Sequence, residues 1–83
     1  MSELPVAVDP GDDVAPPRSN GELVFDEPWQ GRAFGLCVAV LERNRLGWDD
    51  FRPYLVSAIA DVPDDPYYNR FVVALEAFVA DLV

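Results

Sequence analysis

The chain lacks the two chemical devices that most often stabilise a small domain. It has 83 residues, a single cysteine at position 37 and no histidine. One thiol cannot form an internal disulfide, and alone it cannot make a zinc site. A hydrophobic core of this size is marginal by itself. The fold must therefore come from good helix packing or from association with another chain.

The charge balance argues against several classes of partner. Fifteen acidic residues oppose six basic ones, all arginine, and the net charge is −9. Phosphate contacts need a basic face, so we expect no nucleic-acid binding. An acidic surface repels anionic lipids, and no stretch approaches the roughly 18 apolar residues of a membrane span, so no membrane is expected as a partner. The first ten residues do not resemble a signal peptide, which predicts a cytoplasmic location.

Residues 1–22 differ in composition from the rest of the chain. They contain four of the eight prolines and none of the aromatic residues. No periodicity is present, so we predict an extended or disordered acidic, proline-rich arm over residues 1–22. Two interpretations stay open: a solvated tail, or an arm that lies along a partner and becomes ordered on binding.

Residues 23–83 show helical periodicity and no strand pattern, which predicts an all-α domain of three short helices. The first helix is expected to have Asp26 as its N-cap and to end near Asn44. The second should open at Trp48, and the third should follow the N-cap Asp65. The expected buried positions are Trp29, Ala33, Leu36, Cys37, Val40 and Leu41, then Trp48, Phe51, Leu55, Ile59 and Val62, then Tyr68, Phe71, Val72, Leu75, Phe78, Val79 and Leu82.

The first helix has the pattern of a helix packed on two sides. Phe34, Val38 and Ala39 widen its apolar stripe beyond one face. Gly31 and Gly35 each weaken the helix by about 1 kcal/mol relative to alanine, and they allow another backbone to approach closely. Hydrophobic residues make up 51% of the chain. A small domain with this apolar content is expected to expose apolar surface, which predicts an interface for another chain.

The residues of the chain do not form a complete active site. Without histidine there is no Ser–His or Cys–His pair, and no glycine-rich phosphate loop is present. Cys37, within an apolar helix, is interpreted as a small buried hydrophobe. Paired carboxylates such as Asp49 and Asp50 are interpreted as caps and solvated surface. The sequence alone therefore predicts no enzyme that works without a partner.

Two positions have a functional as well as a structural interpretation. Arg52 follows Phe51 beside the apolar stripe of the second helix. It is either an exposed surface residue or a guanidinium that binds an anion supplied by a partner. Tyr67 and Tyr68 open the third helix. They either pack in the core and at its rim or place a phenol in a pocket between chains.

Three blocks of residues resemble the N-terminal helical part of the nitrile hydratase β subunit. They are residues 25–34 (FDEPWQGRAF), residues 48–52 (WDDFR) and the pair Tyr67 and Tyr68. The blocks keep their order and nearly their spacing over residues 24–82. A similar pattern occurs in the matching thiocyanate hydrolase subunit and in nitrile hydratase accessory proteins. The resemblance therefore identifies residues 23–83 as a nitrile hydratase β N-terminal-like domain.

The resemblance implies chemistry that is shared between chains. In nitrile hydratases the α subunit holds non-corrin cobalt(III) or non-haem iron(III) in a claw of partly oxidised cysteines, and a nitrile gains water to become an amide. Arg52 matches the arginine that hydrogen-bonds the oxidised cysteine oxygens. Tyr67 matches a tyrosine near the metal-bound water and the substrate. Trp48 and Phe51 match positions that line the substrate pocket. This chain has no claw, so we expect it to bind no metal or cofactor itself.

The predicted function is that of a small β-type subunit of a heteromeric nitrile hydratase, a lyase that is active only as a complex. The chain ends at Val83, so the resemblance implies a separate chain for the C-terminal β half. Thiocyanate hydrolase and the three-subunit toyocamycin nitrile hydratase resemble that arrangement. The main alternative is an accessory protein, a chaperone that helps the α subunit take up metal and then leaves. A plain helical interaction module is a third interpretation.

Overall fold

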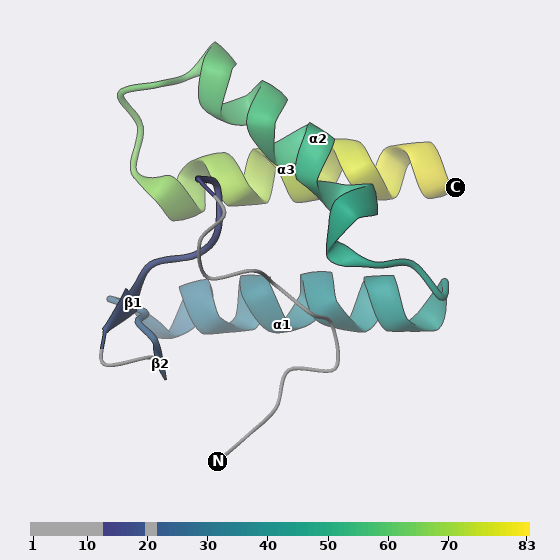
Figure 1. Cartoon of the computed structure of the whole chain (residues 1–83), viewed down its shortest axis with the longest axis horizontal. Helices are drawn as coiled ribbons and strands as arrows, with labels where there is room; N and C mark the ends of the chain where they lie inside the picture. Colours follow the sequence, from purple (N-terminus) through teal and green to yellow (C-terminus); the bar gives the residue numbers. More distant parts are fainter. Residues whose placement is uncertain (1–12, 20–21) are drawn as a thin grey trace.

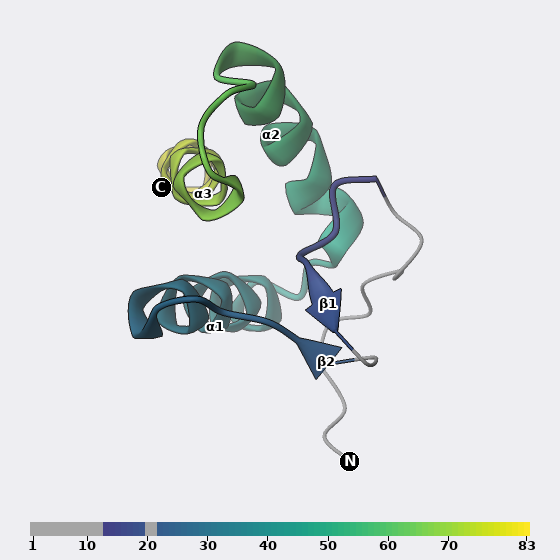
Figure 2. The ribbon, with the colours of Figure 1, turned by 90° about the vertical axis from the view of Figure 1, so that its left-hand side faces the viewer.

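The computed structural model describes residues 13–19 and 22–83. Three helices account for most of this part of the chain: α1 (Pro28–Arg43), α2 (Trp48–Asp61) and α3 (Tyr67–Leu82). Figures 1 and 2 show α1 and α2 on different sides of α3, so that α3 is the helix both others pack against. The predicted all-α class and the three helices are confirmed.

A short antiparallel hairpin precedes the helices. Strands β1 (Arg18–Ser19) and β2 (Glu22–Leu23) pair with Arg18 opposite Leu23. No strand is predicted from the sequence, because two residues are too few for an alternating pattern to be seen. The available signal was the dipeptide Asn20-Gly21 between the strands, a frequent hairpin turn sequence.

Helix α1 begins one residue later than predicted. Its N-cap is Glu27 rather than Asp26, and Pro28 occupies the first helical position. The side-chain oxygen of Gln30 accepts hydrogen bonds from the backbone N–H of Asp26 (2.6 Å) and of Glu27 (3.4 Å). Gln30 is the buried polar residue of this part of the chain, at 9% exposure. Its side chain therefore fixes the helix start and satisfies backbone donors that would otherwise lack partners.

The predicted end of α1 is confirmed, and its geometry explains the turn. Asn44 is the C-cap, and Arg45 follows with a φ of 56°. The N–H of Leu46 donates to the carbonyl of Leu41 (2.8 Å), and the N–H of Arg45 donates to that of Glu42 (3.1 Å). This pair of bonds is a Schellman motif, which reverses the chain toward α2.

Helices α2 and α3 start close to the predicted positions. Helix α2 begins at Trp48 as predicted, and the Asp50 carboxylate accepts a hydrogen bond from the Gly47 N–H at 2.8 Å. The N-cap of α3 is Pro66, one residue after the predicted Asp65. Pro53 lies in the second turn of α2, on an exposed part of the helix, where losing one backbone hydrogen bond costs least.

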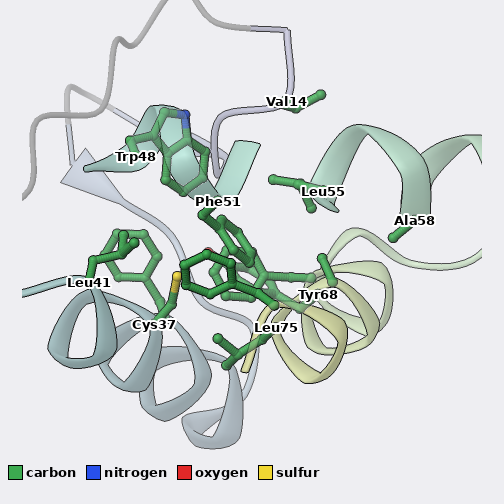
Figure 3. Close-up of a cluster of buried hydrophobic side chains, with 13 residues drawn as sticks. Val14, Cys37, Leu41, Trp48, Phe51, Leu55, Ala58, Tyr68 and Leu75 are labelled. Atoms are coloured by element: carbon green, nitrogen blue, oxygen red, sulfur yellow. The ribbon is translucent and has the colours of Figure 1, made fainter. Parts of the chain in front are cut away.

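One hydrophobic cluster joins the three helices (Figure 3). Phe71 of α3 is at its centre, with ring centroids 5.2 Å from Phe51 of α2 and 6.1 Å from Phe34 of α1. The predicted face of α1 is partly wrong, since Leu36 is 57% exposed. The helix is rotated to bury the larger Phe34 instead. The largest fully buried side chains are Phe51, Phe71, Leu41, Leu55 and Cys37.

The described part of the predicted arm lies against the helices. Val14 is 8% exposed and belongs to the core cluster drawn in Figure 3. The N–H of Val24 donates to the carbonyl of Pro17 at 3.1 Å. The proposed boundary between residues 22 and 23 thus falls within the second strand of the hairpin. Residues 1–12, 20 and 21 of the predicted arm lie outside the described residues.

Within the part that is described, no helix is both long and apolar enough to cross a membrane.

Candidate functional site

The four candidate residues come from the starts of two helices. Trp48, Phe51 and Arg52 lie in the first turns of α2, and Tyr67 is the first residue of α3. Helices α2 and α3 make the most extensive helix–helix contact of the molecule. A carboxylate cap on α2 and a proline before α3 fix where each helix begins, and therefore where these side chains leave the backbone.

A continuous series of ring contacts connects three of the four candidates. The ring of Trp48 lies 5.5 Å from that of Phe51, and Phe51 lies 5.2 Å from Phe71. Phe71 in turn lies 6.1 Å from Tyr67, its neighbour one helical turn away. From the sequence, Phe71 was predicted only as a core residue. The spacing of four residues between Tyr67 and Phe71 was the signal that the two rings share a face.

Trp48 and Phe51 are core residues in this chain. Trp48 is 4% exposed and Phe51 is 0% exposed. A side chain without accessible surface offers nothing to a substrate in this conformation. What Phe51 does here is hold the backbone of the next residue, Arg52, because its ring is fixed by Phe71 and by Phe78 at 5.5 Å. Their role as pocket-lining residues stays a prediction.

Arg52 lies at the edge of this core and is partly exposed. Its backbone is fixed by the buried Phe51 on one side and by the restricted φ of Pro53 on the other. A guanidinium on so rigid a support is well suited to bidentate contact with anionic oxygens. The anion-binding role of Arg52 stays a prediction.

Tyr67 is positioned by the segment that precedes the hairpin. Its hydroxyl donates a hydrogen bond to the backbone carbonyl of Val14 at 2.7 Å. Because the ring is also in contact with Tyr68 and Phe71, the phenol is fixed at both ends. The arm segment thus determines where the Tyr67 oxygen lies.

Tyr68 is the more deeply buried member of the pair. It is 4% exposed, and its hydroxyl has no hydrogen-bond partner among the described residues. Burial raises the pKa of Tyr68 to about 12. The centroid of its ring lies 5.6 Å from that of Phe25 and 5.7 Å from that of Phe71. Tyr68 is therefore a core residue, which leaves Tyr67 as the tyrosine at the rim.

A shallow groove lies on the outer side of α2 and α3. It has a volume of about 370 Å³ and contains none of the four candidates. At its edge the Tyr54 hydroxyl donates to the Asp81 carboxylate at 2.6 Å, and this hydrogen bond raises the pKa of Tyr54. The lining residues are Pro53, Tyr54, Ser57, Ala58, Asp61, Val73, Ala74 and Ala77.

The described residues do not fit a metal ion. Among them there is no group of three or more cysteine or carboxylate side chains that could hold one, and the chain has no histidine. Cys37 is 1% exposed, and burial raises the pKa of its thiol to about 12. A thiol that stays protonated in an apolar setting is a poor ligand.

Comparison with known protein families identifies the family of the chain. A family model described as "Nitrile hydratase beta subunit, N-terminal" matches residues 9–82. The chain belongs to this family. No curated protein and no solved structure matches the chain. Membership in the nitrile hydratase β family implies an α subunit as partner and a metal within that α subunit. It also confirms the resemblance seen in the three sequence blocks.

Proposed function

We propose that the chain is a β-type subunit of a heteromeric nitrile hydratase and that it contributes Arg52 and Tyr67 to the metal site of the α subunit. The family match over residues 9–82 carries this proposal. The structure supports it, because both side chains leave rigid helix starts at the rim of one core. The chain is then a lyase subunit that is active only within the complex.

In this proposal Arg52 binds the anionic oxygens of oxidised cysteines in the α subunit. A planar and permanently charged guanidinium donates two parallel hydrogen bonds to such oxygens. Arg52 would orient the oxidised cysteine ligands and balance their negative charge. The metal, cobalt(III) or iron(III), belongs to the α subunit and supplies Lewis-acid chemistry there.

Tyr67 is proposed to orient the substrate and the attacking water. Its hydroxyl proton points to the Val14 carbonyl, which fixes the position of the phenol oxygen. Trp48 and Phe51 are proposed to shape the wall of the nitrile pocket. Both are buried in the chain by itself, so this role requires that assembly with the α subunit exposes them.

The proposed complex contains the α subunit and a separate chain for the C-terminal half of β, and it is proposed to act in the cytoplasm. The separate chain and the small-subunit type found in toyocamycin nitrile hydratase rest on resemblance alone. Mass spectrometry of the purified active complex tests this part. A single longer β polypeptide in the complex would contradict it.

The test of the site is Arg52→Lys in the complex assembled by co-expression with the α subunit. Lysine keeps the charge but cannot make the bidentate contact, so we expect kcat for nitrile hydration to fall about 10- to 100-fold. The matched control is Arg70→Lys, because Arg70 lies on α3 and donates to the Pro63 carbonyl at 3.3 Å. Full activity of Arg52→Lys would show that the assigned role is wrong.

The accessory-protein alternative makes a different prediction about stoichiometry. A subunit elutes with the active complex in a fixed ratio. A chaperone is absent from the active complex, although the α subunit fails to load metal when the chaperone is omitted. Size-exclusion chromatography with metal analysis separates the two outcomes.

A further inference from the structure

The outer face of α1 has features that no contact within the described chain explains. Arg32, Gly35, Leu36, Ala39 and Arg43 share this face, because their spacing returns to one side of a helix of 3.6 residues per turn. All five are on the side opposite to the buried positions Phe34, Cys37 and Leu41, and all except Gly35 bear side chains that point away from the core. We call these five residues the α1 outer face.

Leu36 makes this face apolar at its centre. It is 57% exposed, the largest exposure among the large hydrophobic residues of the helices. Ala39 beside it is also exposed. A single exposed leucine is ordinary, so this observation alone decides nothing.

Gly35 is the second observation. A mid-helix glycine costs about 1 kcal/mol relative to alanine. A Cβ on Gly31 would be in ordinary van der Waals contact with the Phe25 ring, at 3.5 Å. A Cβ on Gly35 would meet no atom within 4 Å. Nothing in the described chain therefore needs a glycine at this position, whereas a closely approaching backbone would.

Charge is the third observation. Residues 28–46 carry three arginines and one acid, a net charge of +2, within a chain of net charge −9. Residues 47–83 carry seven acids and two arginines. Arg32 and Arg43 flank Leu36 and are both exposed, and no described residue pairs with either guanidinium. The two charges lie about 16 Å apart along the helix, from a rise of 1.5 Å per residue.

We propose that the α1 outer face docks a helix of the α subunit whose carboxylates bind Arg32 and Arg43 and whose backbone approaches Gly35. This inference rests on the proposed function for the identity of the partner. Arginine on both flanks favours carboxylates, since each guanidinium donates two parallel hydrogen bonds to the two oxygens of a carboxylate. A second copy of the chain docking face to face through this same surface is disfavoured, because a twofold contact would place arginines opposite arginines.

The experiment measures the affinity of the purified α subunit for the chain and, separately, the Tm of the free chain. Leu36→Asp is expected to raise the dissociation constant at least about 100-fold, because a charge is placed in the apolar centre of the face. The double variant Arg32→Glu with Arg43→Glu is expected to raise the dissociation constant more at low salt than at high salt. Val73→Asp is the matched control, since Val73 on α3 is 50% exposed, and its affinity should stay within about twofold of the wild type.

Gly35→Ala gives a signature of opposite signs. Alanine fits the open space and favours the helix, so the Tm of the free chain should rise by about 4–8 °C. The same methyl group prevents close approach of the partner backbone, so the affinity for the α subunit should fall about tenfold. A purely structural role for Gly35 would not move the two measurements in opposite directions.

The outcomes separate this inference from the proposed function. If the wild-type chain binds the α subunit and Leu36→Asp and Gly35→Ala bind equally well, the docking face is wrong and the proposed function stands. If the wild-type chain does not bind the α subunit at all, the proposed function fails, and the partner assigned to this face fails with it. If Leu36→Asp lowers the Tm of the free chain by clearly more than the few degrees that follow from the lower helix propensity of aspartate, the chain covers this face itself. If the free chain is a dimer that Leu36→Asp dissociates, the occupant is a second copy. Either of these last two results overturns the proposal.

Discussion

Helices α1 and α2 are both apolar on more than one side, yet they are held to α3 in different ways. Helix α2 places Phe51 against Phe71 and Phe78, and it adds the contact of Tyr54 with Phe78 at 5.2 Å. Its outer surface is closed further by the hydrogen bond from Tyr54 to Asp81. The packing of α2 on α3 is therefore extensive along both helices.

Helix α1 depends on fewer contacts. Its ring contact with α3 is that of Phe34 with Phe71, and Phe25, just before the helix, adds a contact with Tyr68. Helix–helix contact between α1 and α3 is much smaller than that between α2 and α3. Apolar content alone therefore does not show which face of a helix is buried. In α2 the apolar residues serve the core, whereas in α1 part of them faces outward.

Removing a buried ring on each side tests this difference. Phe51→Ala removes a fully buried ring and should lower the free energy of unfolding by about 4–5 kcal/mol. Phe34→Ala removes a ring that is 5% exposed, and α1 can shift to fill part of the cavity, so we expect about 3 kcal/mol. Urea denaturation followed by circular dichroism measures both.

Leu36→Ala is the control for that pair, because its side chain lies on the α1 outer face. We expect its free energy of unfolding to stay within about 0.5 kcal/mol of the wild type. The contrast between α1 and α2 would be wrong if Phe34→Ala lowered the free energy of unfolding as much as Phe51→Ala. It would also be wrong if Leu36→Ala lowered the free energy of unfolding as much as either.

The same contrast shows what the sequence could predict. Helix boundaries were predicted within one residue, because Gly47, Pro28 and Pro66 are strong local signals that act through the backbone. The face of α1 was predicted less well. Periodicity cannot choose between two apolar faces of one helix, and the choice was made by the contact of Phe34 with Phe71, a tertiary contact.

The candidate site shows the same limit. The sequence pointed to Arg52 and Tyr67 through their family positions, and family membership is confirmed over residues 9–82. It did not show that Tyr67 donates to Val14, because that contact joins residues 53 positions apart. Nor did it show that Trp48 and Phe51 are buried within the chain itself. Local signals predict elements, whereas contacts between elements depend on packing.

Alkaline pH should weaken the attachment of α1 through Cys37. Burial raises the pKa of this thiol from 9.0 to about 12, so above pH 9 the unfolded chain loses a proton that the folded chain keeps. The free energy of unfolding should therefore fall as pH rises from about 9, by up to about 1.4 kcal/mol per pH unit. Tyr68, whose pKa is raised from 10.0 to about 12, adds to the fall at higher pH than Cys37, mainly as the pH approaches and exceeds 10.

Cys37→Ala separates the two groups. Between pH 9 and 10 its free energy of unfolding should change little with pH, while that of the wild type falls. Urea unfolding at pH 8, 9 and 10 measures the slopes. Equal slopes for the two proteins in this range would show that the thiol ionises as readily in the folded chain as in the unfolded chain.

The smallest expected effect concerns how the segment around Val14 holds α3. Tyr67→Phe removes the hydroxyl that donates to the Val14 carbonyl and should lower the free energy of unfolding by about 1 kcal/mol. Tyr54→Phe is the matched control. It removes an exposed hydrogen bond to Asp81, which water replaces readily, and should cost about half as much or less.

Because Val14 belongs to the core, losing its bond to Tyr67 should also increase amide hydrogen exchange at Val24, whose N–H is bonded to Pro17 in the same segment. If exchange at Val24 is unchanged while stability falls, the arm segment is held by the burial of Val14 alone. The Tyr67 hydroxyl would then be able to exchange its bond to Val14 for one to the substrate in the complex without loosening the arm.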